Sequence, residues 1–195
     1  ALLEVRYRDL PGAAAVLARG ASEHPQDVTL ARRLVEVLRL IEGGDDGKEL
    51  IDALGNLVEV TGASDLKADL LCELGRLFEE GAGRTSAAIE IFHQALAADP
   101  HHGPTLRALG RIYTRQNNWY GLGDLFEKEL AAPDPLPDAW RRHFQLAEIY
   151  EQHLHNRSAA LRHYRAVLDA RPAFLPALDA VVRLFTEEGD WEELV

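Results

Sequence analysis

An internal repeat of 72 residues constrains the fold of this chain more than any other feature of its sequence. Residues 74–122 align without a gap on residues 146–194. Identical residues recur along this alignment, among them Ser86 and Ser158, Pro100 and Pro172, and Trp119 and Trp191. Because self-similarity at a fixed period marks an architecture in which each unit buries one face against its neighbour, the sequence predicts a stacked array.

The 72-residue unit contains two shorter repeats. Small or aliphatic residues that would seat a close helix contact recur at spacings that alternate between 37 and 35 residues: Leu38, Gly75, Gly110, Ala147 and Val182. A bulky residue follows each of them after three positions: Ile41, Phe78, Tyr113, Tyr150 and Phe185. A second run then follows, with apolar residues every three or four positions, as in an amphipathic helix. No run alternates with period two over enough residues to indicate a sheet, so the sequence predicts an all-α chain of hairpins stacked in series.

Two kinds of turn alternate between the predicted helices. Short turns occupy residues 44–47, 117–119 and 189–191, and long turns occupy residues 81–86 and 153–158. Capping residues for the following helix are present in both long turns: Thr85 or Ser86, and Asn156 or Ser158. Trp119 and Trp191 begin second helices at equivalent positions. We interpret both as packing residues, because a ligand site is not expected to recur at a repeat position.

The pattern resembles the tetratricopeptide repeat. That family's hallmark is a Leu-Gly pair and an aromatic on the first helix, then Ala, an aromatic, Ala and a final Pro on the second. Its best match here is Leu74, Gly75, Phe78, Ala88, Phe92, Ala95 and Pro100. The resemblance implies an α-solenoid, a right-handed superhelix of antiparallel helix hairpins. The single domain 1–195 would divide into a partial hairpin at 1–25, repeats at about 26–62, 63–100, 101–136 and 137–172, and a truncated repeat at 173–195.

Composition limits the classes of partner. The net charge of −11 and the pI near 5.2 argue against nucleic acid or an anionic membrane as the main partner. No apolar run approaches the roughly 18 residues of a membrane-spanning helix, and no signal peptide is recognisable. The chain contains no methionine and opens inside an apparent helix, so we expect it to be a piece of a longer protein. A cytoplasmic location is the expectation.

No pattern in the sequence is typical of an enzyme. There is no nucleophile elbow, phosphate-binding glycine loop or zinc-protease helix. The eight histidines lack the four-residue spacing and carboxylate of a zinc site, and the single cysteine, Cys72, excludes a disulfide framework. We therefore predict a non-catalytic chain with no catalytic residue, metal or cofactor.

The resemblance implies that the first helices line a concave groove. One groove-lining position directly follows the small residue of each repeat: Arg39, Arg76, Arg111, Glu148 and Arg183. Arginine is suited to this surface because its planar guanidinium binds a carboxylate through two hydrogen bonds. In the middle repeat, Arg107, Arg111 and Arg115 follow one another at four-residue spacing. Like charges at that spacing repel, so this arrangement favours a role in binding.

Simpler interpretations stand beside these. Arg39 with Glu42, and Arg76 with Glu79, have the spacing of ion pairs within one helix. For the middle repeat, neutralisation by acids of the neighbouring repeats, Glu79 and Glu148, is the alternative. Phe144 and Cys72 lie three positions before the small residue and face the same groove. Phe144 is either an anchor for a partner or a packing residue, and we interpret Cys72 as a small buried apolar residue.

The sequence thus predicts a protein-interaction module that binds an acidic or carboxylate-bearing segment in its groove. The predicted contact residues are Arg39, Arg76, Arg107, Arg111, Arg115, Phe144 and Arg183. A structural scaffold or spacer in a larger assembly, with self-association of the chain, is an alternative. A regulatory arm of an enzyme encoded elsewhere in the parent protein is another.

Overall fold

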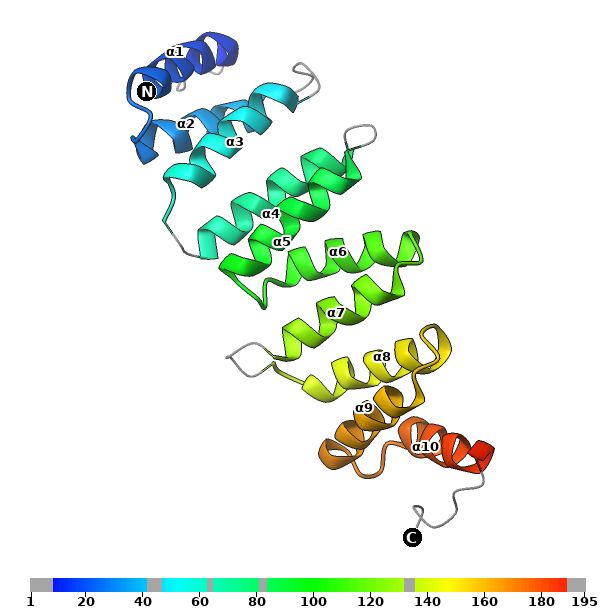
Figure 1. Cartoon of the computed structure of the whole chain (residues 1–195). Coiled ribbons are helices and arrows are strands. Elements are labelled where there is room, and N and C mark those ends of the chain that lie inside the picture. Colours follow the sequence, from blue (N-terminus) through cyan, green and yellow to red (C-terminus); the bar gives the residue numbers. More distant parts are fainter. Residues whose placement is uncertain (1–8, 42–46, 63–64, 81–83, 132–135, 189–195) are drawn as a thin grey trace. The chain divides into compact units, whose positions relative to one another are not determined.

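The chain folds into α-helices joined by short turns. A computed structural model describes residues 9–41, 47–62, 65–80, 84–131 and 136–188. These ranges contain ten helices and no strand: α1 (Leu10–Glu23), α2 (Val28–Arg39), α3 (Lys48–Val60), α4 (Asp65–Glu80), α5 (Thr85–Ala98), α6 (Gly103–Arg115), α7 (Trp119–Leu130), α8 (Ala139–Gln152), α9 (Arg157–Ala170) and α10 (Leu175–Glu188). Figure 1 shows them in chain order. The prediction of an all-α solenoid of helix hairpins is confirmed.

Many of the helices pack against their neighbours in the chain. The contacts are most extensive between α4 and α5 and between α8 and α9, and α2 packs against both α1 and α3. The described part of the chain contains no helix long and apolar enough to cross a membrane.

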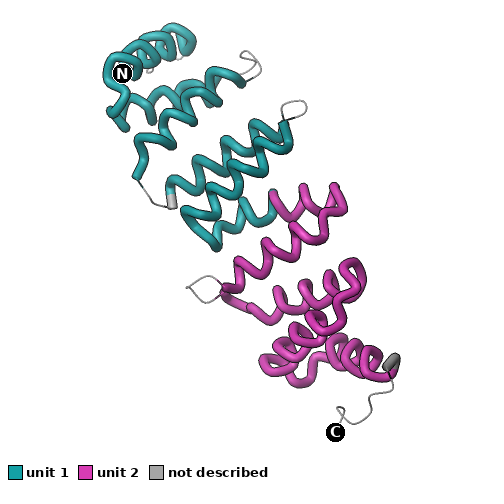
Figure 2. Tube along the Cα trace, viewed as in Figure 1, with its two compact units in different colours: residues 1–108 teal, residues 109–195 magenta. Residues whose placement is uncertain are grey.

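The chain divides into two compact units, residues 1–108 and 109–195, coloured separately in Figure 2. The boundary falls within α6, and each unit has its own buried cluster. In the first unit the cluster includes Leu34, Val35, Leu38, Leu54, Leu57 and Leu71. In the second it includes Ala147, Tyr164, Val167, Ala177 and Leu184. The repeat boundaries expected from the sequence stay a prediction.

Side-chain caps begin several of these helices. Asp27 accepts hydrogen bonds from the backbone N–H groups of Thr29 and Leu30, at 2.8 and 3.2 Å, before α2. Asn156 accepts one from Ala159 before α9, as the sequence predicts. The predicted cap of α5 is wrong. That helix already begins at Thr85, so neither Thr85 nor Ser86 precedes it, and the capping position falls on Arg84, whose side chain makes no capping bond.

Glycine at the small position of α4 permits the closest helix contact. A Cβ atom on Gly75 would lie 2.5 Å from the ring of Phe92, which is fully buried on α5. At the equivalent position of α6, a Cβ on Gly110 would meet Leu122 at an ordinary 3.8 Å. Ala147, which is fully buried, occupies this position in α8. Two glycines that look alike in the sequence therefore differ in how much space surrounds them.

We expect Gly75→Ala to lower the free energy of unfolding by about 1–3 kcal/mol, because the added methyl group must displace a buried ring. Gly110→Ala should instead raise it by about 0.5–1 kcal/mol, since alanine favours the helix and the methyl group fits. Urea unfolding followed by circular dichroism measures both. Equal effects of the two substitutions would contradict the difference in packing.

Candidate functional site

The five residues expected in the groove lie on five first helices: Arg39 on α2, Arg76 on α4, Arg111 on α6, Glu148 on α8 and Arg183 on α10. The four arginines are exposed and Glu148 is half-buried. Burial, reinforced by the nearby charge of Glu151, raises the pKa of the Glu148 carboxyl. The single acid in this series thus differs from the arginines in burial as well as in charge.

Arg39 forms an ion pair with the first helix of the next repeat. Its Nε donates to Oε1 of Glu73 on α4 at 2.8 Å, and a second guanidinium nitrogen donates to the other oxygen of the same carboxylate. This two-pronged hydrogen bond raises the pKa of Arg39, while partial burial lowers it. Glu42, the partner expected from helix spacing, lies outside the described residues. The contact to Glu73 ties α2 to α4 within the first unit.

Arg183 makes the corresponding contact in the second unit. Its guanidinium donates to Oε1 of Glu151 on α8 at 2.5 Å, and the Tyr164 hydroxyl donates to the other oxygen of Glu151 at 2.7 Å. Burial, together with this hydrogen bond, raises the pKa of Tyr164. An acid on the adjacent first helix thus binds both Arg39 and Arg183.

Arg76 has a weaker contact on its own helix. Its guanidinium lies 3.7 Å from Sγ of Cys72, one turn earlier on α4. Cys72 is only 1% exposed, as expected of a small buried apolar residue. Arg76 itself is exposed on the surface of α4.

The highest net positive charge on a first helix lies on α6, which has three arginines and no acid. Arg107, Arg111 and Arg115 are all exposed there. Because they are spaced four residues apart in one continuous helix, they stand on successive turns of the same side. The sequence of α6 contains no aspartate or glutamate. We call these three residues the α6 arginine face.

Phe144 packs within the second unit. It is half-buried on α8, and its ring lies edge-on to Tyr164 at 5.9 Å and to Phe174 at 5.2 Å between centroids. Such edge-to-face pairs stabilise a core beyond the area they bury. These contacts account for Phe144 as a packing residue.

Trp119 begins α7, as the sequence predicts, and stacks on His153 at the end of α8. The two rings are 3.7 Å apart and nearly parallel, at 4°. This contact agrees with the packing role expected of Trp119. The equivalent Trp191 lies outside the described residues.

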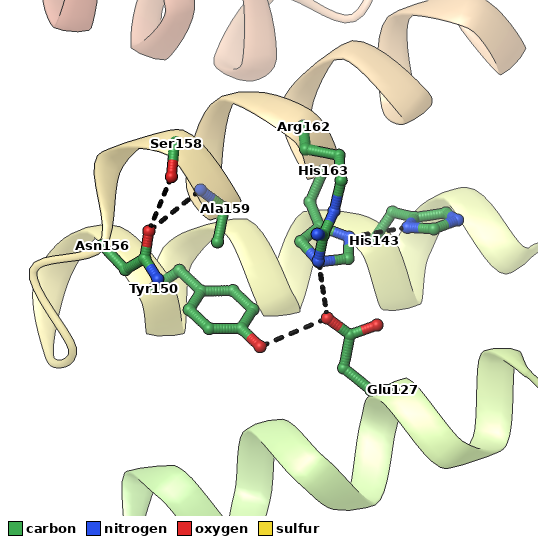
Figure 3. A network of polar contacts seen from close by, with 8 residues as sticks. All are labelled: Glu127, His143, Tyr150, Asn156, Ser158, Ala159, Arg162 and His163. Carbon is green, nitrogen blue, oxygen red and sulfur yellow. Dashed lines mark hydrogen bonds and ion pairs between the residues drawn. The ribbon is translucent and has the colours of Figure 1, made fainter.

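Sequence reasoning missed a polar network that joins α7, α8 and α9 (Figure 3). At its centre, Oε1 of Glu127 accepts hydrogen bonds from the Tyr150 hydroxyl at 3.2 Å and from Arg162 at 2.9 Å. Nε2 of His163 lies 3.0 Å from the same oxygen. One carboxylate therefore connects three consecutive helices of the second unit.

Nε2 of His163 lies between a carboxylate oxygen of Glu127 at 3.0 Å and the Arg162 guanidinium at 3.1 Å. The Glu127 carboxylate only accepts, so a direct hydrogen bond to it requires a proton on Nε2 of His163. In that tautomer Nδ1 of a neutral His163 is an acceptor for Nδ1 of His143, which lies 2.9 Å away. Burial lowers the pKa of both rings, and the neighbouring His163 lowers that of His143 further. Both rings are thus uncharged at neutral pH.

A sequence signal for this network exists. His163 interrupts the buried face of α9, whose other buried members are Ala159, Ala160, Tyr164 and Val167. A polar residue on an apolar face needs a hydrogen-bonding partner, so its position alone indicates a buried polar contact. The described residues contain no group of three or more side chains arranged to hold a metal ion.

Comparison with known proteins identifies the repeats. Family models of the tetratricopeptide repeat match residues 80–119 and 105–139. The C-terminal part of a TPR repeat-containing protein from Cytophaga hutchinsonii has a similar fold, with a TM-score of 0.51 and 13% identity over 95% of this chain and 69% of that one. A crystal structure of MamA gives a TM-score of 0.49 and 19% identity over 85% and 91% of the two chains. Both models fall within residues 80–139, so this part of the chain consists of tetratricopeptide repeats.

A curated relative is much longer. It is the Cellulose synthase operon protein C of Pseudomonas fluorescens (strain SBW25), which is 32% identical over 126 residues. The match covers 64% of this chain and 10% of that protein, so the chain corresponds to about a tenth of its relative.

We expect the free energy of unfolding to fall as the pH drops below about 6.5, the ordinary pKa of histidine in an unfolded chain. Because burial lowers the pKa of His143 and His163 in the folded state, the unfolded chain takes up protons first. The stability that the neutral rings contribute is present above this pH and is lost progressively toward their folded pKa values. Urea unfolding at a series of pH values measures the loss.

The substitution His163→Gln isolates the contribution of the network. Glutamine keeps a donor for Glu127 and an acceptor for His143 but does not titrate, so stability should depend less steeply on pH below about 6.5. His24→Gln, which removes an exposed histidine of the first unit, is the matched control and should retain the full slope. An unchanged slope in His163→Gln would rule out the network as the source.

Proposed function

We propose that this chain is a non-catalytic interaction module whose α6 arginine face binds an acidic or carboxylate-bearing protein segment. The observation that supports the proposal most is the charge of α6. Among the described helices, it alone combines arginines with an absence of acids, in a chain whose net charge is −11. Positive charge collected on one exposed side attracts a negatively charged partner and repels other cations.

The geometry of the arginines also suits carboxylates. Side chains on successive turns are about 5–6 Å apart. Each guanidinium can bind one carboxylate with two hydrogen bonds, so the face matches a segment with several acids or with a terminal carboxylate.

The remaining predicted contacts take a secondary place in this proposal. Arg39 and Arg183 already bind Glu73 and Glu151, so a ligand must exchange one carboxylate for another there. Phe144 is engaged by its aromatic neighbours. Arg76 is exposed and remains a proposed contact on α4.

The double substitution Arg107→Ala and Arg111→Ala should weaken binding of a labelled oligoglutamate peptide between about two- and thirtyfold, because an exposed ion pair contributes about 0.2–1 kcal/mol. Fluorescence anisotropy measures the affinity. Binding by the unsubstituted chain should also weaken with added salt, which screens exposed charges.

A control variant, Arg19→Ala with Arg32→Ala, removes the same charge from exposed positions on α1 and α2. It should bind the peptide as the unsubstituted chain does. If both double variants lose affinity equally, net charge rather than the α6 arginine face governs binding. Thermal unfolding of all three proteins checks that their stability is alike.

The curated relative supports a second candidate function. The name of that protein associates it with a cellulose synthase operon, and this chain matches a tenth of it. We propose as the alternative that the chain is a structural segment of a longer repeat protein that serves the production of cellulose. In that case the array would position other domains of the parent protein, and its contacts would lie within one assembly.

Removal of the segment encoding this chain from its parent gene should then lower the yield of cellulose, measured as glucose released by a purified cellulase. Substitution of Arg107 and Arg111 in the intact gene would separate the two candidate functions. A normal yield after removal of the whole segment would contradict the alternative and leave the first proposal to the peptide measurement.

A further inference from the structure

The first unit contains a groove that is separate from the arginine positions. It is bounded by α1, α2 and α3 and encloses about 600 Å³. This volume is within the range of about 300–1,000 Å³ that is usual for ligand sites. We call it the α1–α3 groove.

One wall of the groove is formed by small apolar residues. Ala14, Ala18 and Ala21 line it from α1, at the four- and three-residue spacing that places them on one side of that helix. Leu34 and Leu38 of α2, both buried, form its floor. Because alanines project little, the space beside them can take the larger apolar side chains of a partner.

The opposite wall is acidic. Glu49, Asp52, Asn56 and Glu59 line the groove from α3 at spacings of three, four and three residues, and all four are exposed. Asp27 adds a fourth carboxylate, which also caps α2. Among the described residues that line the groove there is no lysine or arginine. The groove therefore combines an apolar wall and floor with a negatively charged edge.

The dimensions of the two walls favour a helical occupant. From Glu49 to Glu59 the acidic edge extends for about 15 Å, which is nearly three helical turns. An amphipathic helix lays apolar residues into such a groove at steps of three and four and keeps its polar residues at the rim. Leucine or isoleucine would contact the alanine wall, and lysine or arginine would face the carboxylates.

We propose that the α1–α3 groove binds a basic amphipathic helix of a partner protein. The charge of the groove selects this occupant. An acidic helix would be repelled by the carboxylates. This proposal is independent of the α6 arginine face, which attracts a partner of the opposite charge.

A labelled amphipathic helix built from leucine and lysine is the probe, and fluorescence anisotropy with the whole chain is the measurement. The helix should bind with an affinity that falls as salt is added. Two comparison peptides define the specificity. One has the same composition in an order that destroys the apolar side, and the other replaces every lysine with glutamate. Both should bind at least tenfold more weakly.

Two variants of the groove test where the probe binds. Glu49→Gln with Glu59→Gln should weaken binding between about two- and thirtyfold, because two exposed ion pairs are lost. Ala18→Tyr places a large side chain at an exposed position of the apolar wall and should weaken binding at least tenfold. Circular dichroism and thermal unfolding check that both variants remain folded.

The matched control is Glu36→Gln with Glu90→Gln, which removes two exposed acids outside the groove and should leave binding unchanged. The Arg107→Ala and Arg111→Ala variant should also bind the probe normally, which separates this proposal from the one for α6. The proposal would be overturned if the peptide of the same composition without an apolar side bound as tightly as the probe. It would also be overturned if the control variant lost as much affinity as Glu49→Gln with Glu59→Gln, or if Ala18→Tyr lost none. Sedimentation that shows a dimer occupying the groove would overturn it as well.

Discussion

The hairpin of α4 and α5 depends on a close contact between a small residue of the first helix and a large side chain of the second. At Gly75 the ring of Phe92 occupies the space that any side chain would need. Ala147 is equally buried within the cluster that contains Tyr164. Because this contact determines how the two helices of a hairpin cross, it also determines which side of the first helix faces away. The residue that directly follows the small one lies at that surface, and in four of five repeats it is arginine.

These arginines do not all have the same surroundings. Arg39 and Arg183 each bind a glutamate on the adjacent first helix, so part of the charge that the repeat pattern places on this surface serves to join consecutive hairpins. On α6 no acid shares the helix with the arginines. The acids gather instead on other surfaces, including the α3 edge of the groove in the first unit. One repeat architecture thus presents surfaces of opposite charge.

The fold was predictable because the packing residues recur with the repeat and can be compared with one another. The hydrogen-bonding partners of the polar residues could not be predicted from the sequence. Arg39 binds Glu73, which is 34 residues away, whereas sequence spacing reveals only neighbours within one helix. Likewise, the pattern of α9 places His163 on a buried face, but it does not identify Glu127 and His143 as partners, since these lie on two other helices. The α1–α3 groove depends in the same way on the arrangement of three helices and leaves no local motif.

The ion pairs between first helices would affect how selectively the proposed binding surface responds to ligands. A ligand carboxylate that binds Arg39 must release Glu73, and one that binds Arg183 must release Glu151. Each exchange replaces one ion pair by another of the same kind, so the net change in free energy is close to zero. The protein therefore masks these two arginines with carboxylates of its own. On the proposed binding surface, an acidic polypeptide would therefore gain little from these two positions.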